Sequence, residues 1–85
     1  MTTDDLITQA VTHGVEAALI SHRLAKGEDA PATQSQLGQE MEEHKTAYKA
    51  TLGQLRDLDP EQYEKIHNDV TVRVRGQLVE KLSPK

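Results

Sequence analysis

The sequence predicts an all-α fold, with three helices in one domain spanning residues 1–85. Three observations support this prediction. Apolar residues recur at three- and four-residue steps over most of the chain, as on one face of a helix. Capping and helix-breaking residues divide the chain near residues 27–33 and 59–60. No cysteine is present, and Tyr48 and Tyr63 are the only aromatic residues, so the core must consist mainly of aliphatic side chains.

A chain of this kind is expected to complete its core by association. It has 85 residues, of which 35% are hydrophobic, and a formal net charge of −4. A domain this short buries a modest share of its surface and usually gains stability from disulfides, metal or oligomerisation. Because there is no cysteine, disulfides and thiolate metal sites are excluded. We therefore expect a dimeric helical bundle.

The N-terminal residues point to a cytoplasmic protein. Met1 to Asp5 is polar and acidic, and no apolar run follows that could form the core of a signal peptide. No stretch approaches the length of a membrane-spanning segment. We expect no membrane partner.

The first helix is predicted over residues 4–26. Thr2 or Thr3 can cap it, and an acidic first turn suits the helix dipole. Ala10, Gly14 and Ala18 form a row of small residues four apart. Either the helix tolerates this glycine, at a cost of about 1 kcal/mol relative to alanine, or another helix crosses closely at that point.

A linker is predicted over residues 27–33. Gly27 can end the first helix in a left-handed conformation, and Pro31 opposes simple continuation of the helix. The second helix then follows over residues 34–58, with Thr33 or Ser35 as its cap.

The second helix carries a heptad seam typical of a coiled coil or helical bundle. The two ends of the seam are apolar and its centre is more polar. Leu52 lies beside the seam. The seam consists of Leu37, Met41, His44, Tyr48, Thr51, Leu55 and Leu58.

The third helix is predicted over residues 60–82. Asp59 can cap it, Pro60 suits the first helical position, and Gln62 can complete a capping box. So short a connection is typical of an antiparallel hairpin or a sharp corner between the second and third helices, and the fold that we predict is the hairpin with the first helix added to it. Residues 70–76 alternate like a strand, but no partner strand exists elsewhere in the chain, which favours a helix.

The predicted function is protein–protein interaction, as an adaptor, regulator or inhibitor that forms a homo-oligomer and binds another protein. The seam of the second helix and a helical stripe of the third would supply the interface. That stripe consists of Tyr63, Ile66, His67, Val70, Val74, Leu78 and Leu82. The predicted interface residues are Leu37, Met41, His44, Tyr48, Leu55, Leu58, Ile66 and Val70.

Two alternatives use other side chains. Glu64 and His67 have the three-residue spacing of ferritin-like metal-binding bundles, and Glu40 and His44 share a face of the second helix. In such a bundle these four residues would be the metal ligands. However, Met41 stands three residues before His44, where that pattern would need a glutamate. This mismatch argues for no metal or cofactor.

The second alternative is a nucleic-acid-binding dimer that uses the basic residues Arg73, Arg75 and Lys81. The acidic balance of the chain argues against it. An enzyme is not expected. No cysteine is present, no serine lies in a nucleophile-elbow context, and no glycine-rich phosphate loop occurs.

Overall fold

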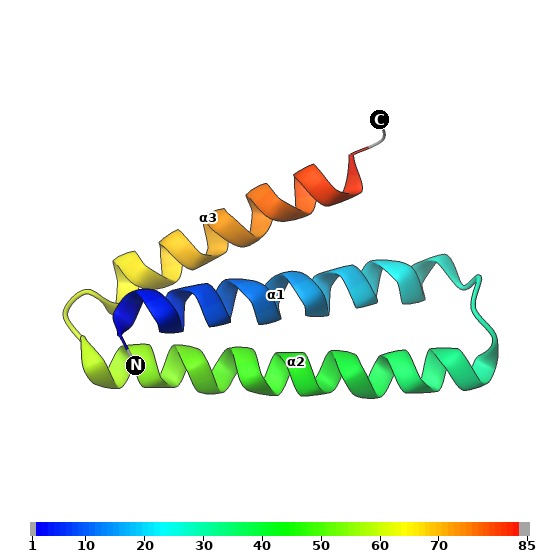
Figure 1. Ribbon diagram of the computed structural model, residues 1–85, viewed down its shortest axis with the longest axis horizontal. Helices are drawn as coiled ribbons and strands as arrows, with labels where there is room; N and C mark the ends of the chain where they lie inside the picture. The colour runs from blue at the N-terminus through cyan, green and yellow to red at the C-terminus, as the bar shows by residue number, and fades with distance from the viewer. Residues whose placement is uncertain (1, 84–85) are drawn as a thin grey trace.

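The computed structural model describes residues 2–83 and contains three α-helices in that range, with no β-strand (Figure 1). Helix α1 spans Thr3–Lys26, α2 spans Pro31–Leu58 and α3 spans Tyr63–Leu82. The all-α prediction is confirmed, and residues 70–76 are helical. Among residues 2–83, no helix has both the length and the apolar character needed to cross a membrane.

The hairpin of the molecule is formed by α1 and α2, not by α2 and α3. The first two helices lie side by side and antiparallel, and α3 turns back over α1 and contacts α2 only slightly (Figure 1). The predicted hairpin of the second and third helices is therefore wrong. A short connection determines where the next helix begins, but the apolar surfaces determine what it packs against, and α1 offers the larger apolar face.

Helix α1 has the ends that the sequence predicts. Thr2 Oγ1 accepts a hydrogen bond from the backbone N–H of Asp5 at 3.2 Å, and the Asp5 carboxylate accepts one from the N–H of Thr2 at 3.4 Å. This reciprocal capping box satisfies two N–H groups that the helix itself leaves unpaired. Gly27 ends the helix with φ 67°, the left-handed conformation that glycine adopts without strain.

Helices α2 and α3 begin elsewhere than predicted. Helix α2 starts at Pro31, three residues before the predicted position, and follows Ala30 without a side-chain cap. Proline fits the first turn because the N–H that it lacks would be unpaired there. Helix α3 starts at Tyr63, and residues 60–62 form a turn. Asp59 Oδ1 still accepts a hydrogen bond from the N–H of Gln62 at 3.2 Å, but it closes the turn before the helix.

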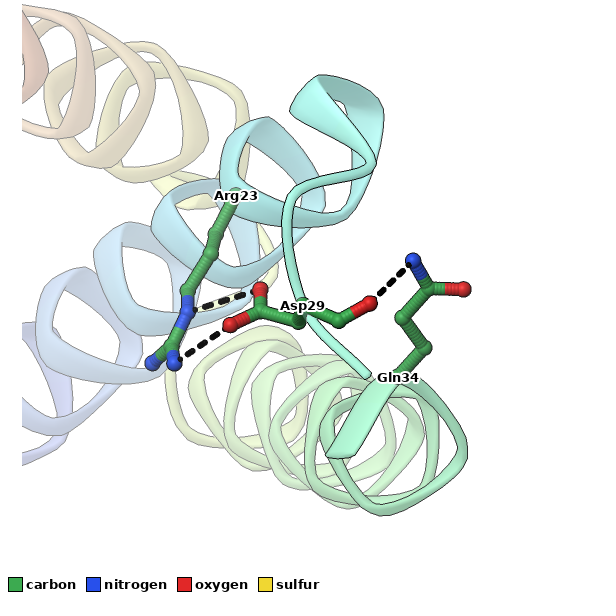
Figure 2. Close-up of polar contacts among 3 residues, drawn as sticks. All are labelled: Arg23, Asp29 and Gln34. Carbon is green, nitrogen blue, oxygen red and sulfur yellow. Dashed lines mark hydrogen bonds and ion pairs between the residues drawn. The ribbon is translucent and has the colours of Figure 1, made fainter. Parts of the chain in front are cut away.

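A bidentate ion pair closes the short loop between α1 and α2 (Figure 2). Arg23 donates from Nε and Nη2 to the two carboxylate oxygens of Asp29, at 3.1 and 2.9 Å. The side-chain amide of Gln34 donates to the backbone carbonyl of Asp29 at 3.0 Å. The loop is therefore connected to the last turn of α1 and the first turn of α2.

The core lies mainly between α1 and α2, and α3 contributes little to it. Val70 is the only fully buried side chain of α3 within the described part of the chain, whereas α1 buries much of one face. The buried cluster consists of Leu6, Ile7, Ala10, Val11, Val15, Leu52, Leu55 and Val70. The buried part of the α2 seam is thus covered by α1 of the same chain.

Candidate functional site

All three helices meet at Gly14. A methyl group at this position would lie 3.0 Å from Cε1 of Tyr48 on α2 and 3.0 Å from Cγ2 of Val74 on α3. Both separations are shorter than ordinary van der Waals contact. Of the two alternatives for Gly14, the structure therefore shows the close helix crossing, and the absence of a side chain there allows both neighbours to approach.

Beyond Gly14, α3 diverges from α1 toward its C-terminal end (Figure 1). A cleft of about 480 Å³ opens there. Small side chains of α1 form part of its lining, and Lys45 and Lys49 of α2 bring positive charge to it. Lys45 also lies 3.7 Å from a carboxylate oxygen of Glu42. The full lining is Gly14, Ala17, Ala18, Ser21, Lys45, Tyr48, Lys49 and Val74.

Helix α3 carries apolar side chains on two faces. Val70 and Val74 face the core, whereas Val72 and Val79 are 64% and 67% exposed. Val72 and Val79 are seven residues apart, so they lie on nearly the same line along the helix. A second, shallower depression lies at the end of the helix and is lined by Leu78, Val79, Leu82 and Ser83. Within residues 2–83, no side chain covers this outward face.

The predicted interface residues fall into three groups. Leu55 and Val70 are 0% exposed, and Leu37 is also buried, so all three belong to the core of the single chain. Leu58 is 59% exposed. The others are half-buried: Met41, His44, Tyr48 and Ile66.

Sequence reasoning missed the outward face of α3. The signal for this face is the alternation of apolar and polar residues over 70–76, which the sequence analysis uses only as evidence for a strand. On a helix, the same alternation places valines on opposite sides, since residues two apart are separated by roughly 200° around the axis. Apolar residues on both sides of a helix indicate that each side carries apolar surface that is buried by packing against another element or partner.

The histidine on α2 has an unpredicted partner. Nδ1 of His44 lies 3.0 Å from Nδ1 of His13 on α1, and both side chains are half-buried. The sequence could not predict this pairing, because sequence spacing cannot show which residues of two different helices face each other. His22, also on α1, is exposed.

The predicted ferritin-like metal constellation does not assemble. Among residues 2–83, no group of three or more metal-ligating side chains comes together. Glu40, Glu64 and His67 are exposed, and His67 packs against Tyr63 with ring centroids 6.0 Å apart. The physical reason is the fold. Helices α2 and α3 share little contact, and His44 faces α1 whereas Glu64 and His67 are exposed.

The basic residues of α3 lie on the surface. Arg73, Arg75 and Lys81 are all exposed, and Arg73 Nε pairs with Asp69 Oδ2 of the same helix at 3.1 Å. Nucleic-acid binding by these residues stays a prediction.

Comparison with known proteins adds no family to this description. No significant match to the chain was found among protein-family models, curated proteins or solved structures.

Proposed function

We propose that this chain is a small protein–protein interaction module that acts as a homodimer, and that the outward face of α3 is the contact surface. The observation that carries the proposal is the exposure of Val72 and Val79, at 64% and 67%, on one line of a helix whose opposite side already packs on the core. Val79 also borders the depression lined by Leu78 and Leu82, and grouped exposed apolar side chains of this kind support an interaction site.

The occupant we propose is a second copy of the chain, because an antiparallel copy of α3 would cover both exposed valines at once. Val72 and Val79 stand at equal distances on either side of a point between Arg75 and Gly76. A twofold axis at that point would place Val72 opposite the partner's Val79, and the reverse, as an isologous interface requires. Gly76 has open space around the position of a side chain, which would allow the two helices to approach closely.

Charged residues on the two flanks of this face are expected to have opposite effects on dimerisation. In the antiparallel pairing, Arg73 would approach Glu80 of the partner subunit, and this contact between opposite charges favours association. Arg75 would lie near the axis and approach its own copy, which opposes association. One helix face also buries less than the roughly 800 Å² per partner of a standard interface, so the dimer is expected to be weak.

Sedimentation equilibrium tests the proposal, at protein concentrations from about 1 to 500 µM, the range in which a weak dimer forms. The wild-type chain should dimerise, and Val79→Glu should remain monomeric with unchanged helicity by circular dichroism. Leu58→Glu is the matched control, since it adds the same charge at an exposed apolar site on α2, outside the proposed contact surface, and it should dimerise normally. Arg75→Gln should tighten the dimer.

Two results would overturn this function. A wild-type chain that stays monomeric across the whole range would exclude the dimer. Equal association of Val79→Glu and wild type would exclude α3 as the contact surface.

The adaptor, regulator or inhibitor role and the cytoplasmic location belong to the same proposal. They are supported by the absence of cysteine and by the surface left uncovered on α3. A pull-down from the native host tests the role, with Val79→Glu as the control bait. Capture of one protein by the wild type is the expected result, and its loss with Val79→Glu would show that binding requires the dimer.

A further inference from the structure

The cleft beside Gly14 has the size and the lining of a site for a small molecule. Its volume of about 480 Å³ falls within the range of roughly 300–1,000 Å³ that such sites occupy. Helix α1 contributes only small residues to the lining, whereas the ring of Tyr48 on α2 and the side chain of Val74 on α3 supply larger apolar surfaces. The lining therefore suits a slender apolar chain.

An additional helix fits this cleft less well. One turn of an α-helix rises about 5.4 Å and, with its side chains, is about 10–12 Å across, so it occupies roughly 400–600 Å³. A cleft of about 480 Å³ therefore holds about one turn. So short a contact is far smaller than a standard protein interface of roughly 800 Å² per partner, which favours a small molecule as the occupant.

Two lysine ammonium groups lie at the edge of the cleft. Lys45 and Lys49 are exposed, both line the cleft, and they stand four residues apart on one face of α2. Their Cβ atoms are then roughly 5–6 Å apart, and like charges at this spacing repel each other. Glu42 lies 3.7 Å from Lys45, whereas no ion pair engages Lys49 among residues 2–83. A bound anion would offset the repulsion and pair with the uncompensated ammonium group of Lys49.

We propose that the cleft binds one amphipathic anion, a medium-chain alkyl carboxylate, with its chain against the small residues of α1 and its carboxylate beside Lys49. A single negative charge matches the single uncompensated ammonium group. No arginine of residues 2–83 lines the cleft, and arginine is the side chain whose planar guanidinium favours phosphate through bidentate contacts. Because both lysines are exposed, burial of the alkyl chain supplies most of the affinity.

The site is separate from the proposed dimer contact. Val74 lines the cleft, whereas Val72 and Val79 lie on the exposed face of the same helix. Val79→Glu, the variant expected to remain monomeric, should therefore bind the carboxylate as the wild type does. The dimer and the carboxylate site can thus fail independently of each other.

Isothermal calorimetry with octanoate, decanoate and dodecanoate, each below its micelle concentration, tests the site. The wild type should bind one equivalent. Each added methylene that enters the cleft should tighten binding about two- to fourfold, because it moves apolar surface out of water. Acetate, which carries the charge without the chain, should show no measurable binding. Equal affinities for acetate and decanoate, or no binding of any carboxylate in the series, would overturn the proposal.

Two pairs of variants locate the chain and the charge. Ala18→Leu places a larger side chain in the cleft and should weaken decanoate binding about tenfold or more. Ala25→Leu makes the same change at an exposed position of α1 outside the lining, and it should bind as the wild type does. Lys49→Gln should weaken binding about two- to fivefold. Lys65→Gln, at an exposed position of α3 outside the lining, should leave it unchanged.

An NMR titration of the wild type with decanoate keeps the test independent of variant folding. The backbone amide resonances of Gly14, Ala18 and Lys49 should shift as the cleft fills. Shifts confined to Val79 and Leu82 would assign the alkyl chain to the outward face of α3 and overturn the site. Equal decanoate affinities of Ala18→Leu and Ala25→Leu would overturn it as well.

Discussion

Gly14 on α1 faces the ring of Tyr48 on α2 so closely that a methyl group at Gly14 would lie 3.0 Å from Tyr48 Cε1. The same methyl group would lie 3.0 Å from Val74 on α3. One residue without a side chain thus determines how near the other two helices can come to α1. The cleft between the three helices begins at this crossing.

Gly14→Leu should destabilise the fold by about 2–3 kcal/mol, because overpacking forces helices and side chains out of their positions. Urea denaturation followed by circular dichroism measures the free energy of unfolding. Gly53→Ala is the matched control. Gly53 also lies within a helix, but nothing approaches within 4 Å of the added methyl group, so the gain in helix propensity should stabilise the fold by about 0.5–1 kcal/mol. Equal stability of the two variants would contradict the close crossing.

Leu55 and Leu58 are three residues apart on α2 and should respond very differently to truncation. Leu55 is 0% exposed and Leu58 is 59% exposed. Leu55→Ala leaves a cavity in the core and should lower the free energy of unfolding by about 2–5 kcal/mol. Leu58→Ala should change it by no more than about 0.5 kcal/mol. Thermal and urea unfolding at low protein concentration measure both effects, and a large cost at Leu58 would show that this side chain is buried.

The ion pair that closes the α1–α2 loop should shift the pKa of Asp29. Hydrogen bonds donated by Arg23 lower the pKa of Asp29 below its usual value. Because the folded-state pKa is depressed, the pair stabilises the fold above the unfolded-state pKa, and that contribution is lost as the pH falls through the folded-state value. Carbon-detected NMR of the carboxyl group measures the pKa.

Arg23→Gln is the variant that separates the ion pair from other effects on Asp29. It removes the guanidinium while keeping a side chain of polar character, and the Asp29 pKa should rise toward its ordinary value. The part of the acid-dependent loss of stability that comes from Asp29 should then disappear, because its pKa is the same in the folded and unfolded states. An unchanged Asp29 pKa in this variant would show that Arg23 is not its partner in solution.

Tyr48 should ionise only at unusually high pH. Its burial raises the pKa of the phenol, and the nearby Tyr63 raises it further. A raised folded-state pKa means that this tyrosine's contribution to stability is complete below the unfolded-state value and is lost as the pH rises through the folded-state value. We therefore expect alkaline destabilisation that begins near the ordinary tyrosine pKa of about 10.

Absorbance of the tyrosinate near 295 nm measures this pKa directly. In Tyr63→Phe, Tyr48 is the only absorbing phenol, and its pKa should stay above the ordinary value because burial is the larger cause. The same variant in concentrated urea provides the reference, where the pKa should return to the ordinary value. Coincident titrations of the folded and unfolded chain would contradict the burial of Tyr48.

Much of the helical structure was predictable because its signals are local. The capping residue Thr2 and the left-handed Gly27 act on the nearest turn of backbone, and both lie where the sequence predicts them. Residues 70–76 are helical despite their strand-like alternation, because a strand needs a hydrogen-bonding partner and no other segment offers one. The start of α2 was not predictable in the same way, because a proline such as Pro31 fits both a helix break and the first turn of a helix.

The pairing of the helices follows from contacts between residues far apart in the chain, which periodicity cannot supply. The heptad seam of α2 correctly indicated a buried face, but the pattern is the same whether α1 or a second chain covers it. Gly14 against Tyr48, and His13 against His44, are likewise relationships between two helices. Local backbone hydrogen bonds explain why each helix forms where it does. Packing of the whole chain decides which apolar faces cover one another, and it leaves the outward valines of α3 exposed.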